Sequence, residues 1–296
     1  MFKLIDGKAH SARLRGEIRA RAEKFSEACG RQIGLAVVLV GNNPASQVYV
    51  RNKIKACEEA GIKSFANYLP DDATQSQVEE LVTSLVEDSK VDGILVQLPL
   101  PKHLDEKAIL DLIPVEKDVD GFSEQNIGRL CMNRDCLVAC TPNGVMQMLK
   151  AEGIDLKGKN VVVIGRSNIV GKPMAMLLLN ADATVTVCHI KTENLKEICR
   201  NADILVAAIG RAKFVTADMV KQGAVVIDVG INRNAEGKLC GDVDFDAVKD
   251  KCSYITPVPG GVGPMTITML LYNTVCAAER SCKLWLKISM KGIPTI

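Results

Sequence analysis

Histidine and net charge are both scarce in this chain, and each shortage excludes a class of protein. The three histidines are scattered along 296 residues, which argues against a histidine-based metal site. The formal net charge is only +2, so composition gives no electrostatic reason to expect binding to nucleic acid or to an anionic membrane surface. We therefore predict a protein with no metal site and no nucleic-acid partner.

Signal-like and membrane-spanning segments are also missing from the sequence. The N-terminal MFKLIDGKAH has too short an apolar run for a secretory signal. The longest apolar stretch, roughly 266–278, contains Thr, Tyr and Asn and is too short to cross a bilayer. These observations predict a cytoplasmic protein with no membrane partner.

The eleven cysteines include no C-x-x-C pair. The nearest group, Cys131, Cys136 and Cys140, is separated by four and then three residues, a spacing that matches no common zinc site. Others, such as Cys57 and Cys188, lie inside apolar segments. We predict reduced cysteines that pack as small hydrophobic side chains.

Short apolar runs alternate with helix-like segments along the chain. The runs typical of buried strands are 33–40, 64–69, 93–97, 160–164, 184–188, 204–207 and 224–229. Helical periodicity marks 47–60, 74–88, 104–113, 142–152, 170–181, 192–200 and 265–285. This alternation predicts parallel sheets covered by helices on both faces, which is the α/β class.

The length suits two domains, and the sequence divides near Cys140-Thr141-Pro142. Thr141 suits a helix N-cap, and Pro142 suits the first helical position. We predict an α/β substrate-binding and catalytic domain over 1–140, a Rossmann-like dinucleotide-binding domain over 141–264, and a cleft between them. The C-terminal segment, 265–296, is expected to pack back on the first domain, although its end from 282 has no clear assignment.

Residues 159–173 read KNVVVIGRSNIVGKP, an apolar strand followed by a tight turn and the start of a helix. The pattern is similar to a dinucleotide-binding fingerprint in which Ser167 replaces the second glycine. Gly165 allows the sharp turn, and Gly171 allows close packing of helix and strand. A structural turn is the alternative for so short a motif, but its place between a buried strand and a helix favours phosphate binding.

The choice between NADP and NAD depends on the end of the next strand. NAD-binding units usually carry an acidic residue there that bonds the ribose 2′-hydroxyl. Here the segment after Cys188 reads His189-Ile190-Lys191-Thr192, without an acid. Arg166 in the turn can pair with a 2′-phosphate instead. The sequence favours NADP, with NAD as the alternative.

Polar side chains in the first half form a candidate substrate site. Tyr49 and Lys53 lie four residues apart on a predicted helix, so they project side by side. Gln97 stands at the end of an apolar strand, and Asp118 and Asp120 lie in the short loop KDVDGF. The alternatives are a solvated lysine and aspartates that only form a turn. A stiff loop, TPVPGGVGPMTIT at 256–268, has few side chains to keep a flat ligand away.

Taken in order and spacing, YVRNK, QLPLP, KDVDGF, CTPNGV, VIGRSNIVGKP and TPVPGGVGPMT resemble the methylenetetrahydrofolate dehydrogenase/cyclohydrolase family. The resemblance runs from about residue 3 to 280 and matches the compact bifunctional form. It implies oxidation of 5,10-methylenetetrahydrofolate with NADP and hydrolysis of the methenyl product to 10-formyltetrahydrofolate. A homodimer formed through the second domain is also a family expectation.

The resemblance implies a role for each matching residue. Lys53 is the expected catalytic lysine, Gln97 orients it, Tyr49 stacks on the aminobenzoate ring, and Asp120 binds the amino-pyrimidine edge of the pterin. Expected contacts to the folate also come from Pro259, Gly260 and Gly261, and contacts to the cofactor from Gly165, Arg166, Ser167, Ile190 and Ile231. Ile190 departs from the family, where a polar residue that can touch the 2′-phosphate is common.

Three rival functions share parts of this pattern. Another two-domain NAD(P)-dependent oxidoreductase, of the shikimate or amino-acid dehydrogenase type, would carry the fingerprint without needing Tyr49, Lys53, Gln97 and Asp120 together. A catalytically dead scaffold would have no need of Lys53 or Asp120. A dehydrogenase without cyclohydrolase activity would not need both Lys53 and Gln97.

Overall fold

The computed structural model describes residues 1–282, which fold into two compact units. The six-stranded unit consists of Met1–Arg13 and Ala139–Met269, and the three-stranded unit consists of Leu14–Val138 together with the described residues from Leu270 onward. Two long helices, α1 (Gly7–Cys29) and α10 (Val262–Ser281), contribute residues to both units. Both sheets are parallel and carry helices, which confirms the predicted α/β class.

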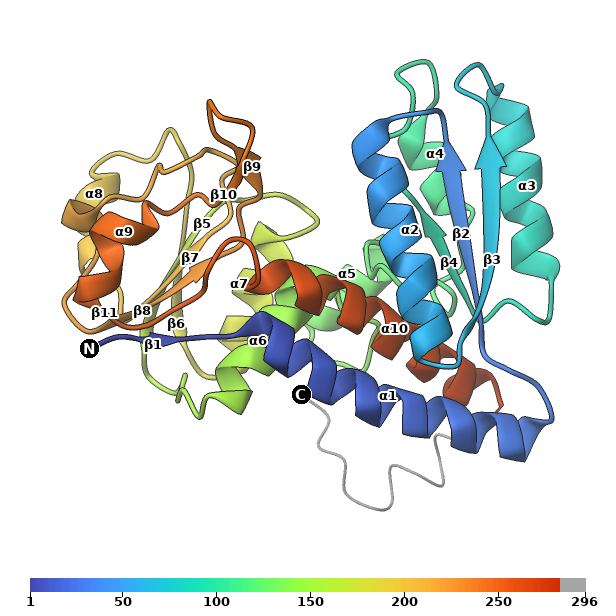
Figure 1. Cartoon of the computed structure of the whole chain (residues 1–296), viewed down its shortest axis with the longest axis horizontal. Coiled ribbons are helices and arrows are strands. Elements are labelled where there is room, and N and C mark those ends of the chain that lie inside the picture. The colour runs from blue at the N-terminus through green and yellow to red at the C-terminus, as the bar shows by residue number, and fades with distance from the viewer. Residues whose placement is uncertain (283–296) are drawn as a thin grey trace. The chain divides into compact units, whose positions relative to one another are not determined.

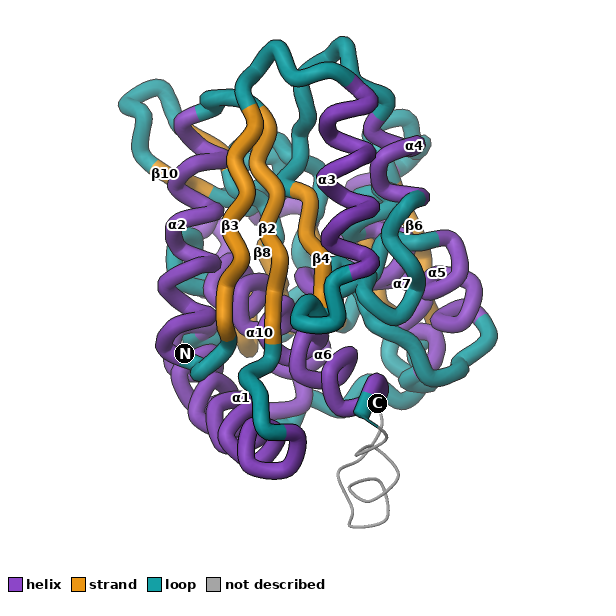
Figure 2. The backbone as a smooth tube through the Cα atoms, turned by 90° about the vertical axis from the view of Figure 1, so that its right-hand side faces the viewer, coloured by secondary structure: helices purple, strands orange, loops and turns teal. Residues whose placement is uncertain are grey.

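The three-stranded unit is built around one fully buried strand. Its sheet has the order β3 (Lys63–Leu69), β2 (Gly34–Val40), β4 (Gly93–Val96), which Figure 2 shows side by side. Every residue of β2 is buried because α2 (Pro44–Glu59) and α3 (Gln75–Glu87) flank the sheet from opposite sides, as Figure 1 shows. A capping box between Thr74 and Gln77 starts α3. Two shorter helices, α4 (Glu106–Asp111) and α5 (Glu124–Cys131), complete the unit.

The six-stranded unit has the strand order β1-β11-β8-β7-β5-β6. These strands are β1 (Lys3–Leu4), β5 (Asn160–Ile164), β6 (Thr184–Cys188), β7 (Ile204–Ala207), β8 (Ala224–Asp228) and β11 (Cys252–Ile255). In Figure 1, α8 (Leu195–Arg200) and α9 (Phe245–Val248) lie on one side of the sheet, with α6 (Cys140–Ala151) and α7 (Gly171–Asn180) on the other. A small hairpin, β9 (Asn232–Arg233) and β10 (Leu239–Cys240), follows β8.

Several elements differ from the sequence-based expectation. Helix α1 was not predicted, although Leu14, Ile18 and Ala22 form a buried stripe at four-residue spacing. Thr141 is not an N-cap, because α6 begins one residue earlier and Ala139 precedes it without a side-chain cap. The Thr141 hydroxyl is instead 2.9 Å from that of Thr266 on α10.

The division into a substrate-binding and a dinucleotide-binding domain, with boundaries at 140 and 264, stays a prediction. The two compact units show how the chain packs, but they do not show which ligand each part binds. The C-terminal part of α10 belongs to the three-stranded unit, where the Asn273 amide donates to the carbonyls of Val119 and Val138 at 2.8 Å each. The predicted packing of 283–296 lies outside the described residues.

The sequence predicts reduced cysteines that pack as hydrophobic groups, and it predicts no membrane-spanning segment. All eleven cysteines are free thiols in the described chain, and six of them are buried. Burial raises the pKa of several of these thiols, including Cys57 and Cys252, each to about 12, so they stay protonated and act as packing groups. Within residues 1–282, no helix combines the length and the apolar character needed to span a bilayer.

Candidate functional site

A lysine and a glutamine meet at the carboxyl end of the three-stranded sheet. Lys53 lies on α2, and Gln97 directly follows β4. The Lys53 ammonium donates a 3.0 Å hydrogen bond to the Gln97 Oε1 atom. The Gln97 side-chain Nε2 group in turn donates to the Leu98 carbonyl at 2.7 Å, which fixes the amide with its oxygen toward the lysine. Both side chains are half-buried, so the lysine is neither fully solvated nor fully enclosed.

The two aspartates of the loop KDVDGF differ in their hydrogen bonds. Asp118 is buried, and its carboxylate accepts hydrogen bonds from the backbone N–H groups of Gly121, Phe122 and Ser123 at 2.8–3.2 Å. Asn126 adds a side-chain bond of 2.9 Å to the same carboxylate. The turn-forming alternative is therefore correct for Asp118. None of these bonds involves Asp120, which leaves its carboxylate for other partners.

Asp120 has a perturbed proton affinity. Burial raises the pKa of its carboxyl to about 6, the positive charge of Lys53 lowers it, and the negative charge of Asp118 raises it. Lys53 thus acts electrostatically on both Gln97 and Asp120. Tyr49, one turn before Lys53 on α2, contributes an exposed ring with 42% of its surface accessible. The structure therefore groups Lys53, Gln97 and Asp120 in the three-stranded unit, with Tyr49 on the same helix as the lysine.

The glycine-containing turn after β5 adopts the geometry that its sequence predicts. Gly165 has φ +134°, and a Cβ there would lie 2.2 Å from the Ala208 carbonyl oxygen. A Cβ at Gly171 would lie equally close, 2.2 Å, to the Gly165 carbonyl oxygen. Only glycine fits at both places, so strand and helix approach closely, as in a dinucleotide-binding turn.

Ser167 holds the turn that precedes α7. Its hydroxyl accepts hydrogen bonds from the backbone N–H groups of Val170 and Gly171 at 3.2 and 3.3 Å. The backbone N–H groups of Val170 and Gly171 are therefore bonded inside the turn. The Arg166 side chain is exposed, as are Ile190 after β6 and Ile231 after β8. These residues follow three strands at the carboxyl edge of the six-stranded sheet, where α/β proteins bind nucleotides.

The loop after β11 holds Pro259, Gly260 and Gly261 in the six-stranded unit. The Val258–Pro259 peptide bond is cis, as is Leu98–Pro99 in the other unit. The Gly260 carbonyl accepts a 3.2 Å hydrogen bond from the backbone N–H of Lys8, at the start of α1. The start of helix α1 thus supports this loop, a contact that the sequence did not reveal.

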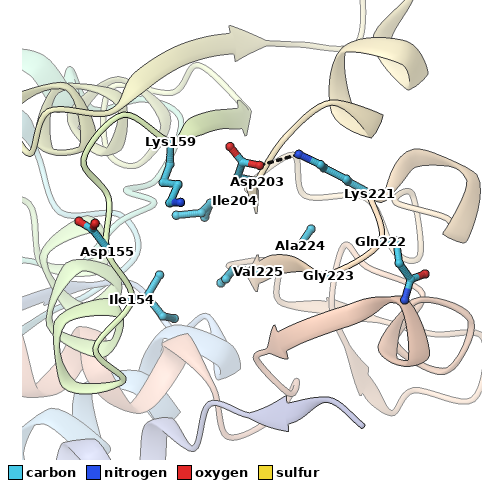
Figure 3. Close-up of a pocket in the computed structure, with 10 residues that line it drawn as sticks. All are labelled: Ile154, Asp155, Lys159, Asp203, Ile204, Lys221, Gln222, Gly223, Ala224 and Val225. Carbon is cyan, nitrogen blue, oxygen red and sulfur yellow. Dashed lines mark hydrogen bonds and ion pairs between the residues drawn. The ribbon is translucent and has the colours of Figure 1, made fainter.

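A separate cavity of about 210 Å³ lies at the opposite edge of the six-stranded sheet. Figure 3 shows its lining residues, which include Lys159, Asp203 and Gly223 immediately before β5, β7 and β8. Lys221 and Asp203 form an ion pair of 2.6 Å at its rim. None of the predicted site residues lines this cavity, and the amino edge is not where α/β sheets usually bind ligands. Among residues 1–282, no three His, Cys, Asp or Glu side chains are grouped to hold a metal ion.

Fold and site together define an α/β enzyme with a nucleotide-binding sheet and a separate lysine-centred site. Two family models match the chain: the tetrahydrofolate dehydrogenase/cyclohydrolase catalytic domain at residues 5–120 and the NAD(P)-binding domain of the same family at 139–282. The chain therefore belongs to the tetrahydrofolate dehydrogenase/cyclohydrolase family. It is a bifunctional enzyme of folate-bound one-carbon metabolism, as the sequence motifs predicted.

Individual relatives support this assignment over nearly the whole chain. A bifunctional protein FolD from Campylobacter concisus is 60% identical over 278 residues, which cover 94% of this chain and 98% of that protein. The crystal structure of the bifunctional FolD enzyme from Campylobacter jejuni has a TM-score of 0.93 at 52% identity, covering 95% of this chain and all of that one. The FolD structure from Trypanosoma brucei, complexed with NADP and an inhibitor, has a TM-score of 0.91 at 41% identity and covers 95% of this chain and 99% of that one.

The rival oxidoreductase class is similar in fold only. Shikimate 5-dehydrogenase from Thermus thermophilus has a TM-score of 0.52 at 17% identity, covering 83% of this chain and 99% of that one. Such a distant likeness reflects a shared two-domain α/β architecture and not a shared substrate.

Proposed function

We propose that this chain oxidises 5,10-methylenetetrahydrofolate with NADP and hydrolyses the resulting methenyl cation, using Lys53 as the proton-transfer group of the second step. The observation that carries the assignment is the Lys53 ammonium bonded to Gln97 Oε1 at 3.0 Å, with the carboxylate of Asp120 in electrostatic contact. This hydrogen bond supports a functional lysine over a solvated surface lysine.

For the oxidation step, the protein must mainly align the folate with the nicotinamide ring. The bound nicotinamide ring supplies a hydride acceptor at C4. The chain contributes positioning: the carboxylate of Asp120 accepts N–H groups of the amino-pyrimidine edge, and the Tyr49 ring stacks on the aminobenzoate. Both contacts fix the plane of the folate, so that its methylene carbon faces one direction only.

The hydrolysis step asks for proton transfer. Water adds to the methenyl carbon and loses one proton to the base. The bond between this carbon and N5 then breaks while the hydroxyl proton of the adduct passes to N5, which gives 10-formyltetrahydrofolate. Lys53 accepts a proton only in its neutral form, and the adjacent cation of the substrate favours that form. Gln97 offers the lysine a neutral acceptor, which orients the amine without adding the negative charge that would hold the proton on it.

NADP is the proposed cofactor because Arg166 is retained at the exposed turn after β5 and residues 189–192, directly after β6, include no acid. Gly165 and Ser167 form the turn proposed to receive the pyrophosphate. Ile190, where the family commonly has a polar residue, offers no bond to a 2′-phosphate. Arg166 therefore carries the preference alone in this proposal.

A spectrophotometric assay tests the proposed function. Purified protein is supplied with methylenetetrahydrofolate and NADP or NAD in turn, while methenyltetrahydrofolate absorbance is followed. We expect turnover with NADP to exceed turnover with NAD, and methenyltetrahydrofolate supplied directly to be hydrolysed faster than without enzyme. A protein inactive on both folates, or one that reduces NADP with shikimate, would refute the proposal.

A homodimer formed through β6 completes the proposal. This strand is an edge of the six-stranded sheet, and Val187 on it is 43% exposed. Light scattering is expected to give the mass of a dimer for the native chain and of a monomer for Val187→Lys, whereas a monomeric native chain would refute it. The cytoplasmic location expected from the sequence also stays a prediction, which fractionation of the source cells tests.

A further inference from the structure

Two buried carboxylates at the carboxyl edge of the six-stranded sheet have no part in the chemistry proposed above. Asp228 is the last residue of β8, and Asp242 follows β10; their exposed fractions are 3% and 0%. In the described part of the chain, every hydrogen bond to these side chains comes from a neutral N–H group. Burying two carboxylates costs free energy unless such donors compensate for lost water, so these contacts define the local backbone tightly.

Asp242 gathers the loop that follows β7. Its carboxylate accepts hydrogen bonds from three successive backbone N–H groups, those of Ile209, Gly210 and Arg211, at 2.7, 3.0 and 2.9 Å. The Asn232 side-chain amide donates a fourth, at 2.8 Å. Asp242 thereby ties the loop after β7 to the start of the hairpin after β8.

Asp228 holds the other side of the same region. Its carboxylate accepts from the backbone N–H groups of Gly230, Asp242 and Val243 at 2.9–3.0 Å. Its own backbone N–H donates to the Thr256 hydroxyl at 2.7 Å, which links β8 to the loop after β11. Burial raises the pKa of Asp228 to about 6, the charge of Asp242 raises it, and the N–H donors lower it.

The loops held in this way lie on one side of the proposed phosphate site. In the sheet, β5 stands between β6 and β7, and β7 pairs with β8 through Ala207 and Asp228. If the pyrophosphate lies at the β5 turn and the 2′-phosphate half on the β6 side, the nicotinamide half extends over β7 and β8. Ile231, a predicted cofactor contact, stands between Gly230 and Asn232, and the two carboxylates bond both neighbours.

We propose that Asp242 and Asp228 are positioning residues that fix the loops after β7 and β8 around the nicotinamide half of the cofactor. The inference rests on the proposed function, because it assumes that NADP occupies the carboxyl edge of this sheet. It goes further by separating the two halves of the site: the turn at Gly165 and Arg166 binds the adenosine half, and the carboxylate pair orders the half that reacts.

Two probes distinguish this role from general support of the fold. NADP contains both halves of the cofactor, whereas 2′,5′-ADP contains only the adenosine half with its 2′-phosphate. In Asp242→Asn, one carboxylate oxygen becomes an NH₂ group, which cannot accept hydrogen bonds from the N–H groups that face it. We expect kcat/KM for NADP to fall by about tenfold, while the dissociation constant of 2′,5′-ADP measured by calorimetry changes by less than about twofold.

Matched variants keep the experiment decisive. Asn232→Ala removes one hydrogen-bond donor, from a half-buried side chain. We expect this variant to fold fully and to lose less kcat/KM for NADP than Asp242→Asn does. The control is Asp203→Asn, whose carboxylate accepts the Asn160 backbone N–H at the opposite edge of the same sheet and should leave both probes unchanged.

The measurements distinguish failure of the positioning role from failure of the proposed cofactor function. Equal weakening of NADP and 2′,5′-ADP, or no effect of Asp242→Asn and Asn232→Ala on NADP kinetics, would overturn the positioning role. A native protein that binds neither probe would instead overturn the proposed cofactor function. If Asp242→Asn fails to fold, Asn232→Ala alone decides.

Discussion

The Lys53 ammonium donates a 3.0 Å hydrogen bond to Gln97 Oε1, and the rest of the Gln97 amide is fixed by its 2.7 Å bond to the Leu98 carbonyl. The glutamine therefore cannot turn its NH₂ group toward the lysine without losing that second bond. An uncharged acceptor of fixed direction is suited to a lysine that must both hold and release a proton.

Replacing this neutral acceptor by a charged one should disable the base. In Gln97→Glu, a carboxylate beside the ammonium forms an ion pair with it, which opposes release of the proton. We expect cyclohydrolase activity to fall by about tenfold or more and the remaining activity to require a higher pH. A pH–rate profile of methenyltetrahydrofolate hydrolysis that matches the native enzyme would exclude the orienting role of Gln97.

Asp120 predicts a pH dependence of folate binding. Its pKa is raised to about 6 by burial, and only the ionised carboxylate accepts both N–H groups of an amino-pyrimidine edge. The KM for methylenetetrahydrofolate should therefore rise as pH falls through about 6. In Asp120→Asn, KM should be high and nearly independent of pH; a native KM that is flat from pH 5 to 8 is the contrary result.

The same shift has a consequence for stability. Because the folded pKa of Asp120 lies above its ordinary value of 3.8, the folded chain binds more protons than the unfolded chain between these values. The contribution of Asp120 to stability therefore falls as pH rises from about 4 to about 6. Thermal unfolding should show Asp120→Asn more stable than the native protein at pH 7, with the difference vanishing near pH 4.

The proposed contact of Arg166 with the 2′-phosphate leads to a prediction about cofactor preference. Removal of its guanidinium in Arg166→Ala should raise KM for NADP by about tenfold or more and change KM for NAD little, because only NADP carries the 2′-phosphate. Lys159→Ala is the matched control, since this exposed cation precedes β5 at the opposite edge of the sheet. An equal loss with both cofactors would show that Arg166 does not read the 2′-phosphate.

Gly165→Ala tests the geometry of the turn after β5. The new Cβ would meet the Ala208 carbonyl oxygen at 2.2 Å, and φ +134° strains any residue except glycine. We expect loss of measurable NADP binding and a lower melting temperature. Gly16→Ala on α1, where a Cβ meets nothing within 4 Å, should be neutral or stabilising by about 1 kcal/mol. Unchanged cofactor binding in Gly165→Ala would argue against this turn as the phosphate site.

Much of the fold could be predicted where burial determines composition. The strand β2 is a continuous apolar run because both of its faces are covered, so its sequence signal is unambiguous. Helix α1 was missed because charged residues dominate it and its buried stripe is narrow. The edge strand β1, only two residues long, pairs with a strand far along the chain and has no local pattern to reveal it.

The candidate site divides in a similar way. Tyr49 and Lys53 were found because their four-residue spacing places them side by side on one helix, and Gln97 was found because it follows an apolar strand. Asp242 escaped notice because its three backbone partners lie 31–33 residues earlier in the chain, in a loop whose backbone amides have no sequence signature. Asn273 holds the loop of Asp120 through backbone carbonyls more than 130 residues away, which no local pattern can indicate.

The most direct test of the central claim compares both activities in Lys53→Met, with Lys55→Met as an exposed control on the same helix. Methenyltetrahydrofolate absorbance is followed during oxidation of methylenetetrahydrofolate and during hydrolysis of methenyltetrahydrofolate supplied directly. We predict that Lys53→Met loses hydrolysis by about a hundredfold or more, while the control keeps both activities. Hydrolysis by Lys53→Met at the native rate would contradict the account.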